Sequence, residues 1–434
     1  MAVVIESEIW MPNKALYLFL LVACFLSLLY LPAKSSGNVF DHSSSPNSLR
    51  FQRNFLAVFV LSSVIQGSSS VFGEYELSYF GFSKEQALNY LCIGYAASLI
   101  LGIFLGTLFD QIGHRRSCLF FYLLHLSASL LKITGGDSSI WLSGICLSVA
   151  SSTFFFCFEA WMVAELDPNK VGTRQDTVND MFWLMNLFES ASFVGSQFVG
   201  NYLISRDARK STVPIWKEIL LLSLLATLYV SWGWKKRAPE KKPPPRLASP
   251  FRVAAAAADA RIWLLACAQS CVHFAISTFW IIWAPTAIAD GRELSLGMIY
   301  PCLIGCKMLG SACSPWLYGP LSLRPEECLV YAFPIMALVL GAVAYDYQEI
   351  EVLMILFCVF HACAGVVLPS LARLRTVYVP NEIRGGMMSL SAVPANAALL
   401  FLLLTGYVAN SGMVWVAAFG MGAASGCMFM LKKW

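Results

Sequence analysis

The sequence predicts an all-α polytopic membrane protein with twelve core transmembrane helices in two six-helix bundles, plus one extra N-terminal helix. Three observations lead to this fold class. The 434 residues are 58% hydrophobic and only 13% charged, whereas a soluble domain carries about 25% charged residues. The apolar residues gather in runs of about 20, the length that crosses the hydrocarbon core of a bilayer. A basic, proline-rich segment divides these runs into two sets of six.

The apolar runs give the expected elements in chain order. One N-terminal run covers residues 14–32. The first set of six covers 54–73, 88–108, 116–134, 140–164, 180–204 and 214–234, and the second covers 262–289, 295–318, 328–345, 350–372, 385–407 and 413–431. Residues 235–246, between the sets, hold six basic residues and three consecutive prolines, so this segment is a solvated linker. We therefore divide the chain into 1–48 (extra helix and polar connector), 49–234 (first bundle), 235–261 (linker) and 262–434 (second bundle).

Lysine and arginine residues are distributed unevenly between the two membrane sides. If the linker is cytoplasmic, the loops on its side hold 21 of them and the opposite loops hold eight, although four of those eight crowd into the loop at 205–217. The bias follows the positive-inside rule. Glu6 and Glu8 precede the first run where a signal peptide would carry positive charge, so we expect a retained helix with its N-terminus outside; a cleaved signal peptide is the alternative. We expect a monomer in the lipid bilayer of the plasma membrane, with an endomembrane as the alternative.

Several classes of function are not supported by the sequence. The net charge of +4 gives no nucleic-acid footprint. Most of the fourteen cysteines lie in apolar runs, and pairs such as Cys267 and Cys271 lack the spacing of a zinc knuckle. No nucleophile–base constellation and no phosphate-binding glycine loop is recognisable. We therefore expect no enzyme, no metal and no cofactor.

The sharpest local pattern lies between the second and third core spans. It consists of Gly106, Asp110, Gly113, Arg115 and Arg116. Gly106 allows close approach of a second helix, and Gly113 allows a tight turn. Asp110 could pair with an arginine or cap a facing helix. We expect a latch that holds the cytoplasmic side shut in one state and breaks in the other.

This pattern resembles the loop signature of the major facilitator superfamily, at the position that the superfamily gives it. A narrower resemblance, to a divergent, plant-like member of the molybdate-anion transporter family, is spread over residues 49–400. It rests on 50–53 with Gln66 and Gly67, on 158–161, on 283–285, and on 368–370 with Arg373. The resemblance implies a major facilitator fold and alternating-access transport of molybdate. The chain departs from the family's pattern at Ser63, Val64, Ser68, His273 and Ala392, which leaves the substrate open.

Ionisable side chains inside the spans are candidates for function, because burying a charge in a membrane is costly. Glu159 lies among phenylalanines, which favour its neutral form, so we expect it to carry a coupling proton. A structural ion pair at the cytoplasmic end is the alternative. Glu189 is a second proton-coupling candidate or a polar tie between helices. Lys307 is the one basic residue well inside a span, and we expect it to bind an anion; neutralisation by Glu159 or Glu189 is the alternative.

Uncharged polar residues at helical spacing complete the expected substrate site. Tyr300 lies seven residues before Lys307, on the same helical face. His273 follows Gln269 by one turn, and Asn396 lies two turns after Ser389. These residues could hydrogen-bond an oxyanion.

Three basic residues flank one predicted cytoplasmic loop. They are Arg373, Arg375 and Arg384. We assign them mainly to topology, with a gating contact to Asp110 as the alternative, and we include Arg384 among the gating residues.

The sequence thus favours a secondary transporter of a small anionic solute, with Glu159 and Glu189 as the candidates for coupling its movement to protons. The leading solute is molybdate, by resemblance alone. One alternative is a carrier of a sugar or another small organic solute with the same fold. The other is a membrane scaffold or sensor that does not transport.

Overall fold

The computed structural model describes most of the helical chain. The described residues are 46–70, 80–166, 175–207, 211–233, 259–288, 296–345, 349–406 and 410–434, together with 10, 12, 13, 15, 18–20, 22–26, 77 and 294. Residues 15, 18–20 and 22–26, within the predicted N-terminal span, are helical. Residues 27–45 and 234–258, which hold most of the predicted connector and linker, lie outside the described residues.

Each of the twelve expected core spans coincides with a helix. The first half consists of α2 (Pro46–Ser70), α4 (Lys84–Ile112), α5 (His114–Thr134), α6 (Asp137–Glu165), α8 (Gln175–Arg206) and α9 (Val213–Gly233). The second half consists of α11 (Ala260–Ile288), α12 (Leu296–Ala312) with the short α13 (Ser314–Tyr318), α14 (Pro325–Ala344), α15 (Ile350–Tyr378), the 3-10 turn η2 (Asn381–Ile383), α16 (Arg384–Thr405) and α17 (Asn410–Lys433). Within the described residues, extended structure is limited to one isolated bridge, between Trp10 and Leu294.

Two of the expected boundaries differ in a way that matters for the site. The helix α2 begins at Pro46 rather than at 54, and α15 continues to Tyr378 rather than ending at 372. Both extensions carry arginines, which end an apolar run but do not end a helix. Arg373 and Arg375 are therefore helical residues near the end of α15.

Ten helices of the described chain are long and apolar enough to cross a membrane. The helices α2 and α8 are not among the ten, although they have 25 and 32 residues. Polar side chains such as Gln66 in α2 and Glu189 in α8 lower their hydropathy. These side chains line a cavity inside the protein, so they do not face lipid.

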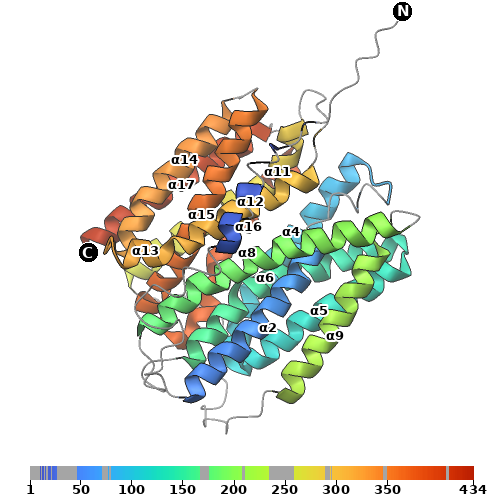
Figure 1. Ribbon diagram of the computed structural model, residues 1–434, viewed down its shortest axis with the longest axis horizontal. Coiled ribbons are helices and arrows are strands. Elements are labelled where there is room, and N and C mark those ends of the chain that lie inside the picture. The colour runs from blue at the N-terminus through green and yellow to red at the C-terminus, as the bar shows by residue number, and fades with distance from the viewer. Residues whose placement is uncertain are drawn as a thin grey trace, which may run out of the picture.

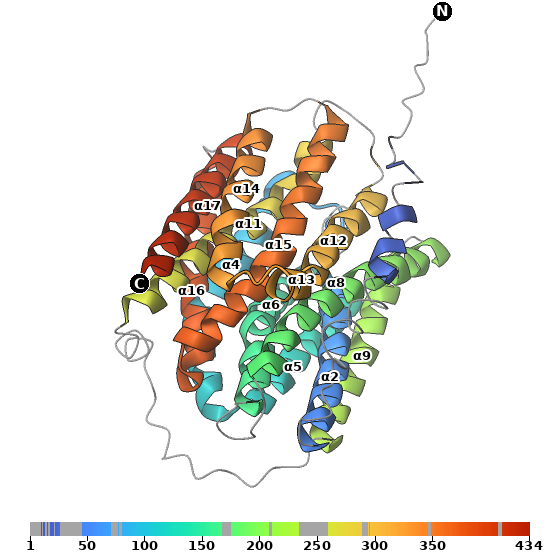
Figure 2. The same cartoon turned by 60° about the vertical axis from the view of Figure 1, so that its left-hand side comes forward.

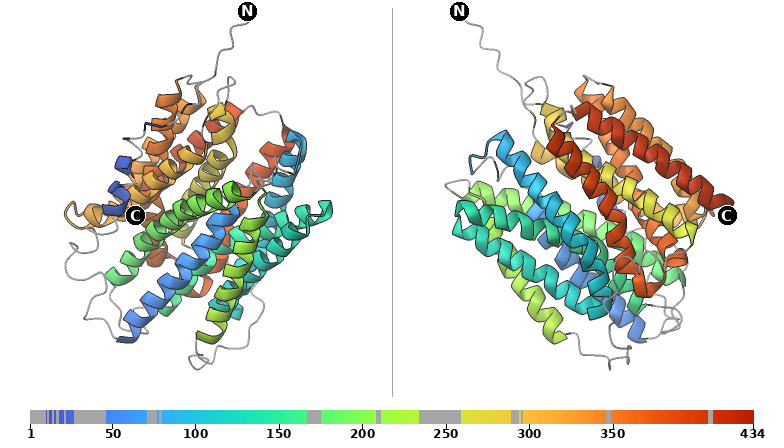
Figure 3. Two further views of the ribbon diagram at one scale, coloured as in Figure 1. Left: turned by 45° about the vertical axis from the view of Figure 1, so that its right-hand side comes forward. Right: turned by 180° about the vertical axis from the view of Figure 1, so that it is seen from behind.

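The two halves form separate helical bundles, each with its own hydrophobic core (Figures 1 and 2). In the first half, α5 packs on α6 and α9, and α2 packs on α8. In the second half, α14 packs on α15 and α17, and α11 packs on α16 and α17. The halves meet where α4 packs on α16 and where α8 packs on α12 and α15, and Figure 3 shows the two bundles side by side. The second helix of each half thus contacts the fifth helix of the other.

Local sequence explains where the helices that form this contact begin and end. A capping box starts α4: the Ser83 hydroxyl accepts from the Gln86 N–H at 3.2 Å, and the Gln86 side chain accepts from the Ser83 N–H at 2.9 Å. Gly113 ends α4 with φ at +97° and lets α5 begin one residue later. This backbone conformation favours glycine, as the sequence predicts for the tight turn.

Candidate functional site

A cavity of about 1020 Å³ lies between the two halves. We call the end of the bundle at which α9 ends and α11 begins the linker side. The cavity extends from the middle of the helices toward the opposite side, where Ser205 and Leu296 line it. Its polar lining comes from Gln66, Glu189, Gln197, Asn201, Gln269, His273, Tyr300, Lys307 and His361, and its aromatic lining includes Phe155, Trp280, Trp283 and Phe360.

An ion pair between the halves lies in this cavity. The Lys307 Nζ atom, on α12, is 3.0 Å from the Glu189 Oε1 atom, on α8. The two side chains are 13% and 22% exposed, so both remain accessible from the cavity. The pairing agrees with the alternative in which Glu189 neutralises Lys307. It also leaves the anion-binding hypothesis open, because an incoming anion could take the place of the carboxylate.

The other predicted substrate residues divide between two locations. Tyr300 and Gln269 line the large cavity, and the Gln269 Oε1 atom also accepts a hydrogen bond from Arg375. The His273 Nε2 atom lies 3.2 Å from the Asn396 Oδ1 atom. His273 lines both the large cavity and a smaller adjoining one, whereas Asn396 lines only the smaller one.

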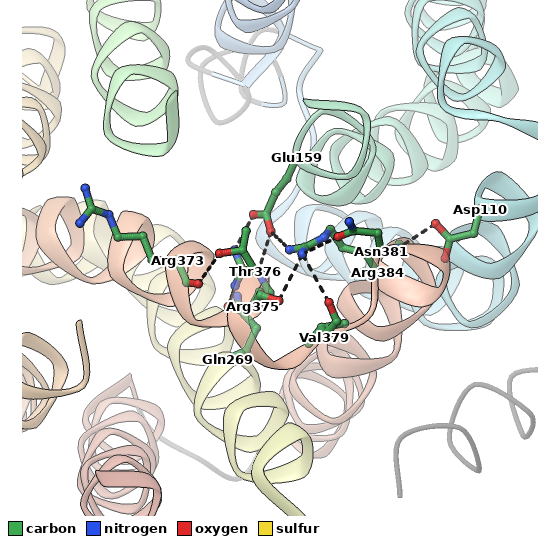
Figure 4. Close-up of polar contacts among 10 residues, drawn as sticks. Asp110, Glu159, Gln269, Arg373, Arg375, Thr376, Val379, Asn381 and Arg384 are labelled. Atoms are coloured by element: carbon green, nitrogen blue, oxygen red, sulfur yellow. Dashed lines mark hydrogen bonds and ion pairs between the residues drawn. The ribbon is translucent and has the colours of Figure 1, made fainter. Parts of the chain in front are cut away.

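A buried charge network joins the two halves on the linker side (Figure 4). Glu159, near the end of α6, accepts two hydrogen bonds from Arg375 of α15, at 2.8 Å from Nε and 2.5 Å from Nη2. The Arg384 Nη1 atom lies 3.5 Å from the same carboxylate. Arg384 also donates to the carbonyl oxygens of Arg375 and Val379 and to Asn381, and its side chain is only 1% exposed. The network joins the two halves through charges that are removed from water.

Glu159 therefore occupies the ion pair that the sequence analysis gave as its alternative role. Both carboxylate oxygens are engaged by guanidinium groups, and the side chain is 10% exposed. Its role as the carrier of a coupling proton stays a prediction.

Asp110 forms a second contact across the halves on the linker side. Its carboxylate accepts hydrogen bonds from the backbone N–H groups of Gly385, at 3.1 Å, and Gly386, at 2.7 Å. These are N–H groups at the start of α16, so Asp110 caps a facing helix, one of its two expected roles. A Cβ atom added to Gly106 would meet the Gly385 carbonyl and the Ser389 side chain, so the backbones of α4 and α16 approach closely there.

The remaining basic residues of this region point elsewhere. Arg115 donates to the Ser231 carbonyl at 2.5 Å, within the first half, and Arg116 is exposed. Arg373 lies over the Tyr318 ring, 3.6 Å from its centroid, and points away from the Glu159 network (Figure 4). The alternative in which Arg373 contacts Asp110 is therefore not what the structure shows.

Comparison with known proteins identifies the fold and the family. A family model described as sugar transporters with 12 transmembrane helices, within the major facilitator superfamily, matches residues 16–352. The chain belongs to this family. Molybdate-anion transporters of Takifugu rubripes and Xenopus laevis are each 23% identical to it, over 88% and 73% of this chain and 84% and 70% of their own lengths. This major facilitator protein is therefore a relative of the molybdate-anion transporters.

Solved structures of other major facilitator transporters have the same fold. The human organic anion transporter MFSD10 gives a TM-score of 0.65 at 15% identity, over 88% of this chain and 99% of its own. The Escherichia coli fucose:proton symporter gives 0.67 at 13%, over 88% and 99%. A bacterial homologue of the iron transporter ferroportin, in an outward-facing state, gives 0.68 at 17%, over 89% and 100%.

Several site residues of this major facilitator protein were missed by sequence reasoning. Arg375 was assigned to topology because it follows the apolar part of α15. His361 and His125 are not among the predicted site residues, yet His361 lines the large cavity and His125 contacts Gln66 of α2 at 3.3 Å. Ser151, which accepts a hydrogen bond from Gln66 at 2.7 Å, belongs to no sequence pattern that would have indicated a site. Their partners come from other helices, which spacing within one helix does not reveal.

Over the residues that the structure describes, no group of three or more His, Cys, Asp and Glu side chains could hold a metal ion. The polar groups of the site are instead arranged as ion pairs and hydrogen bonds between helices.

Proposed function

We propose that this protein is a secondary transporter that carries a small oxyanion, molybdate foremost, by alternating access. The observation that supports the proposal best is the position of Lys307. It brings a positive charge into a cavity between two six-helix halves, with polar groups around it. A dianion that leaves water needs such a charge, together with hydrogen-bond donors.

The Glu189 carboxylate pairs with the Lys307 ammonium at 3.0 Å, so an anion has to compete with it for Lys307. A proton on Glu189 would cancel this attraction and free Lys307 for the substrate. Tyr300, His273 and His361 are the other titratable groups among the described residues that line this cavity. Coupling of anion and proton movement through Glu189 follows from this competition.

Alternating access requires two closures that exclude each other. The contacts of Asp110 with α16 and of Glu159 with Arg375 join the halves on the linker side, while the large cavity lies toward the other side. Rocking of the halves about the cavity would break these contacts and expose the bound anion to the linker side. The linker-side network would then act as the gate.

A sugar or another organic solute is the second candidate. The family description names sugar transporters, and Trp280, Trp283 and Phe155 line the cavity. Aromatic rings of this kind pack against the apolar faces of sugars. The solute can be decided by competition between oxyanions and hexoses.

Uptake into vesicles that contain the purified protein tests the proposal. We expect uptake of labelled molybdate that tungstate or sulfate inhibits and hexoses do not. Lys307→Ala should abolish it, whereas Lys432→Ala, which removes an exposed lysine paired with Glu327, should leave it unchanged. Uptake of a hexose instead, or full molybdate uptake by Lys307→Ala, would contradict the proposal.

A scaffold or sensor that does not transport is the third candidate. It would need the fold but not the gate. An Asp110→Ala variant with full biological activity in cells and no measurable uptake in vesicles would favour that function.

A further inference from the structure

A second cavity, of about 270 Å³, adjoins the large one between α4, α6, α11 and α16. The two share Phe155 and His273 in their linings. No charged side chain is among the described residues that line the smaller cavity. Its polar groups are hydroxyls, one imidazole and one amide, from Tyr90, Tyr95, Ser98, Ser148, Ser151, Ser152, His273, Ser277, Ser389 and Asn396.

Three serines of α6 supply free hydroxyl hydrogens to this cavity. Ser148, Ser151 and Ser152 follow the i, i+3, i+4 spacing of one helical face. Serine and threonine hydroxyls in helices commonly donate to a carbonyl one turn earlier, as Ser143 and Thr153 do on the same helix, at 2.6 and 2.8 Å. Within the described part of the chain, these three hydroxyls donate to no protein group.

A chain of hydrogen bonds fixes Ser151 as a donor toward the cavity. The Gln66 Oε1 atom can only accept, so the His125 Nε2 atom, 3.3 Å away, carries the hydrogen. The Gln66 amide nitrogen then donates to the Ser151 hydroxyl oxygen at 2.7 Å. The hydroxyl hydrogen of Ser151 remains available, and the side chain is exposed to the cavity.

Asn396 of α16 provides a further hydrogen-bond donor, on the wall of the cavity that faces α6. The residue is only 5% exposed, and its carbonyl oxygen is taken by the His273 Nε2 atom at 3.2 Å. Its NH2 group has no hydrogen-bond partner among the described residues. A nearly buried amide nitrogen therefore faces the cavity without a protein acceptor.

We propose that this serine-lined cavity is a neutral oxyanion subsite, which binds the anion through hydroxyl and amide donors after it leaves Lys307. A tetrahedral oxyanion offers only acceptors, which match the four free donors of Ser148, Ser151, Ser152 and Asn396. A sugar could donate to the same hydroxyl oxygens, but an oxyanion gains more from each donor, because hydrogen bonds to a charged acceptor are about twice as strong as those between neutral groups. A cation would need a carboxylate, and none lines the cavity.

The inference rests on the proposed oxyanion transport and adds a separate place for the anion. At Lys307, the anion competes with Glu189. In the serine-lined cavity it meets no protein charge, so it is held by hydrogen bonds alone. A site without a fixed cation lets the ion leave again, which a carrier requires.

Binding of molybdate to the purified full-length protein tests the subsite. We expect Ser151→Ala and Ser148→Ala to weaken binding roughly tenfold each, the cost of one hydrogen bond to a charged group. Ser143→Ala is the matched control, because it removes a hydroxyl of the same helix that is bound to its own backbone; its affinity should equal that of the wild type. Ser151→Thr keeps the hydroxyl and should restore binding.

A second variant covers the case in which a serine variant fails to fold. Asn396→Asp keeps the size of the side chain but replaces the NH2 donor with a carboxylate oxygen, so it should weaken molybdate binding more than Ser151→Ala. Thermal unfolding of each variant shows that it is folded.

The outcomes separate the subsite from the proposed function. Wild-type binding with the expected losses supports both. Wild-type binding that is unchanged in the serine and Asn396 variants overturns the subsite and leaves oxyanion transport standing. If the wild-type protein binds neither molybdate nor sulfate, the proposed function and the subsite both fall.

Discussion

Replacing Glu159 with glutamine should open the linker side. The substitution keeps the shape of the side chain but removes the charge that faces Arg375 at 2.5 Å and Arg384 at 3.5 Å. These arginine side chains are 9% and 1% exposed. Removing one partner of a buried ion pair costs about 3–5 kcal/mol, because the other charge stays buried and unpaired. We expect a cost of this size for the closed linker side.

That cost corresponds to a change of about two to three and a half powers of ten in the equilibrium between closed and open forms. Two conformations of a protein commonly differ by a few kcal/mol, so the substitution is large enough to invert their populations. The amide hydrogens of Gly385 and Gly386 report this change directly. They bond to Asp110 across the halves, and this contact is lost when the linker side opens.

Hydrogen–deuterium exchange of the segment 381–390, followed by mass spectrometry, measures the effect. We expect exchange in Glu159→Gln to be at least about 100-fold faster than in the wild type, from the same energy. Lys432→Gln is the control: it removes a positive charge from the same half, but that side chain is exposed and pairs with Glu327 at 3.1 Å, so it should leave exchange unchanged. The double variant Glu159→Gln with Arg375→Gln should recover part of the protection. Equal protection in Glu159→Gln and wild type would refute a closing role for this network.

Three further substitutions test other parts of the structure. Gly106→Ala should lower the thermal unfolding temperature, because its Cβ meets α16; overpacking of this kind costs about 1–3 kcal/mol. Gly102→Ala is the control, since a Cβ there enters open space and should leave the unfolding temperature unchanged. Equal unfolding temperatures for the two variants would contradict the close approach of α4 and α16. Gly113→Ala should lower the free energy of unfolding by about 1–2 kcal/mol, because a residue with a Cβ atom is strained at a φ of +97°. Gly136→Ala is the control in the same measurement, since the φ of Gly136 is −81°. Glu189→Gln should tighten molybdate binding at neutral pH and flatten its dependence on pH, because no carboxylate then competes for Lys307. In the wild type, binding should tighten as the pH falls; a Glu189→Gln protein with wild-type affinity and slope would argue against coupling through this residue.

The sequence alone determined the number of core helices and their approximate positions. Membrane crossing depends on the length and composition of a local segment, so both can be read without knowledge of neighbours. Local conformation was equally accessible, as Gly113 shows. Lys307 was found by the same logic, because a lysine in an apolar helix is unusual wherever that helix lies. The family could also be recognised, since the Asp110 pattern is short and local.

Only the tertiary structure decided which charges meet. Glu159 and Arg375 are 216 residues apart, and Lys307 and Glu189 are 118 apart. Arg373 and Arg375 are close together on one helix, yet two residues rotate a helix by about 200°, so Arg373 stacks on Tyr318 and Arg375 pairs with Glu159. In the sequence, Arg373 and Arg375 are two arginines with the same hydropathy at the end of the same apolar run. Their roles separate only when the facing helices supply a ring for one and a carboxylate for the other, because pairing between helices depends on their rotation and packing rather than on local composition.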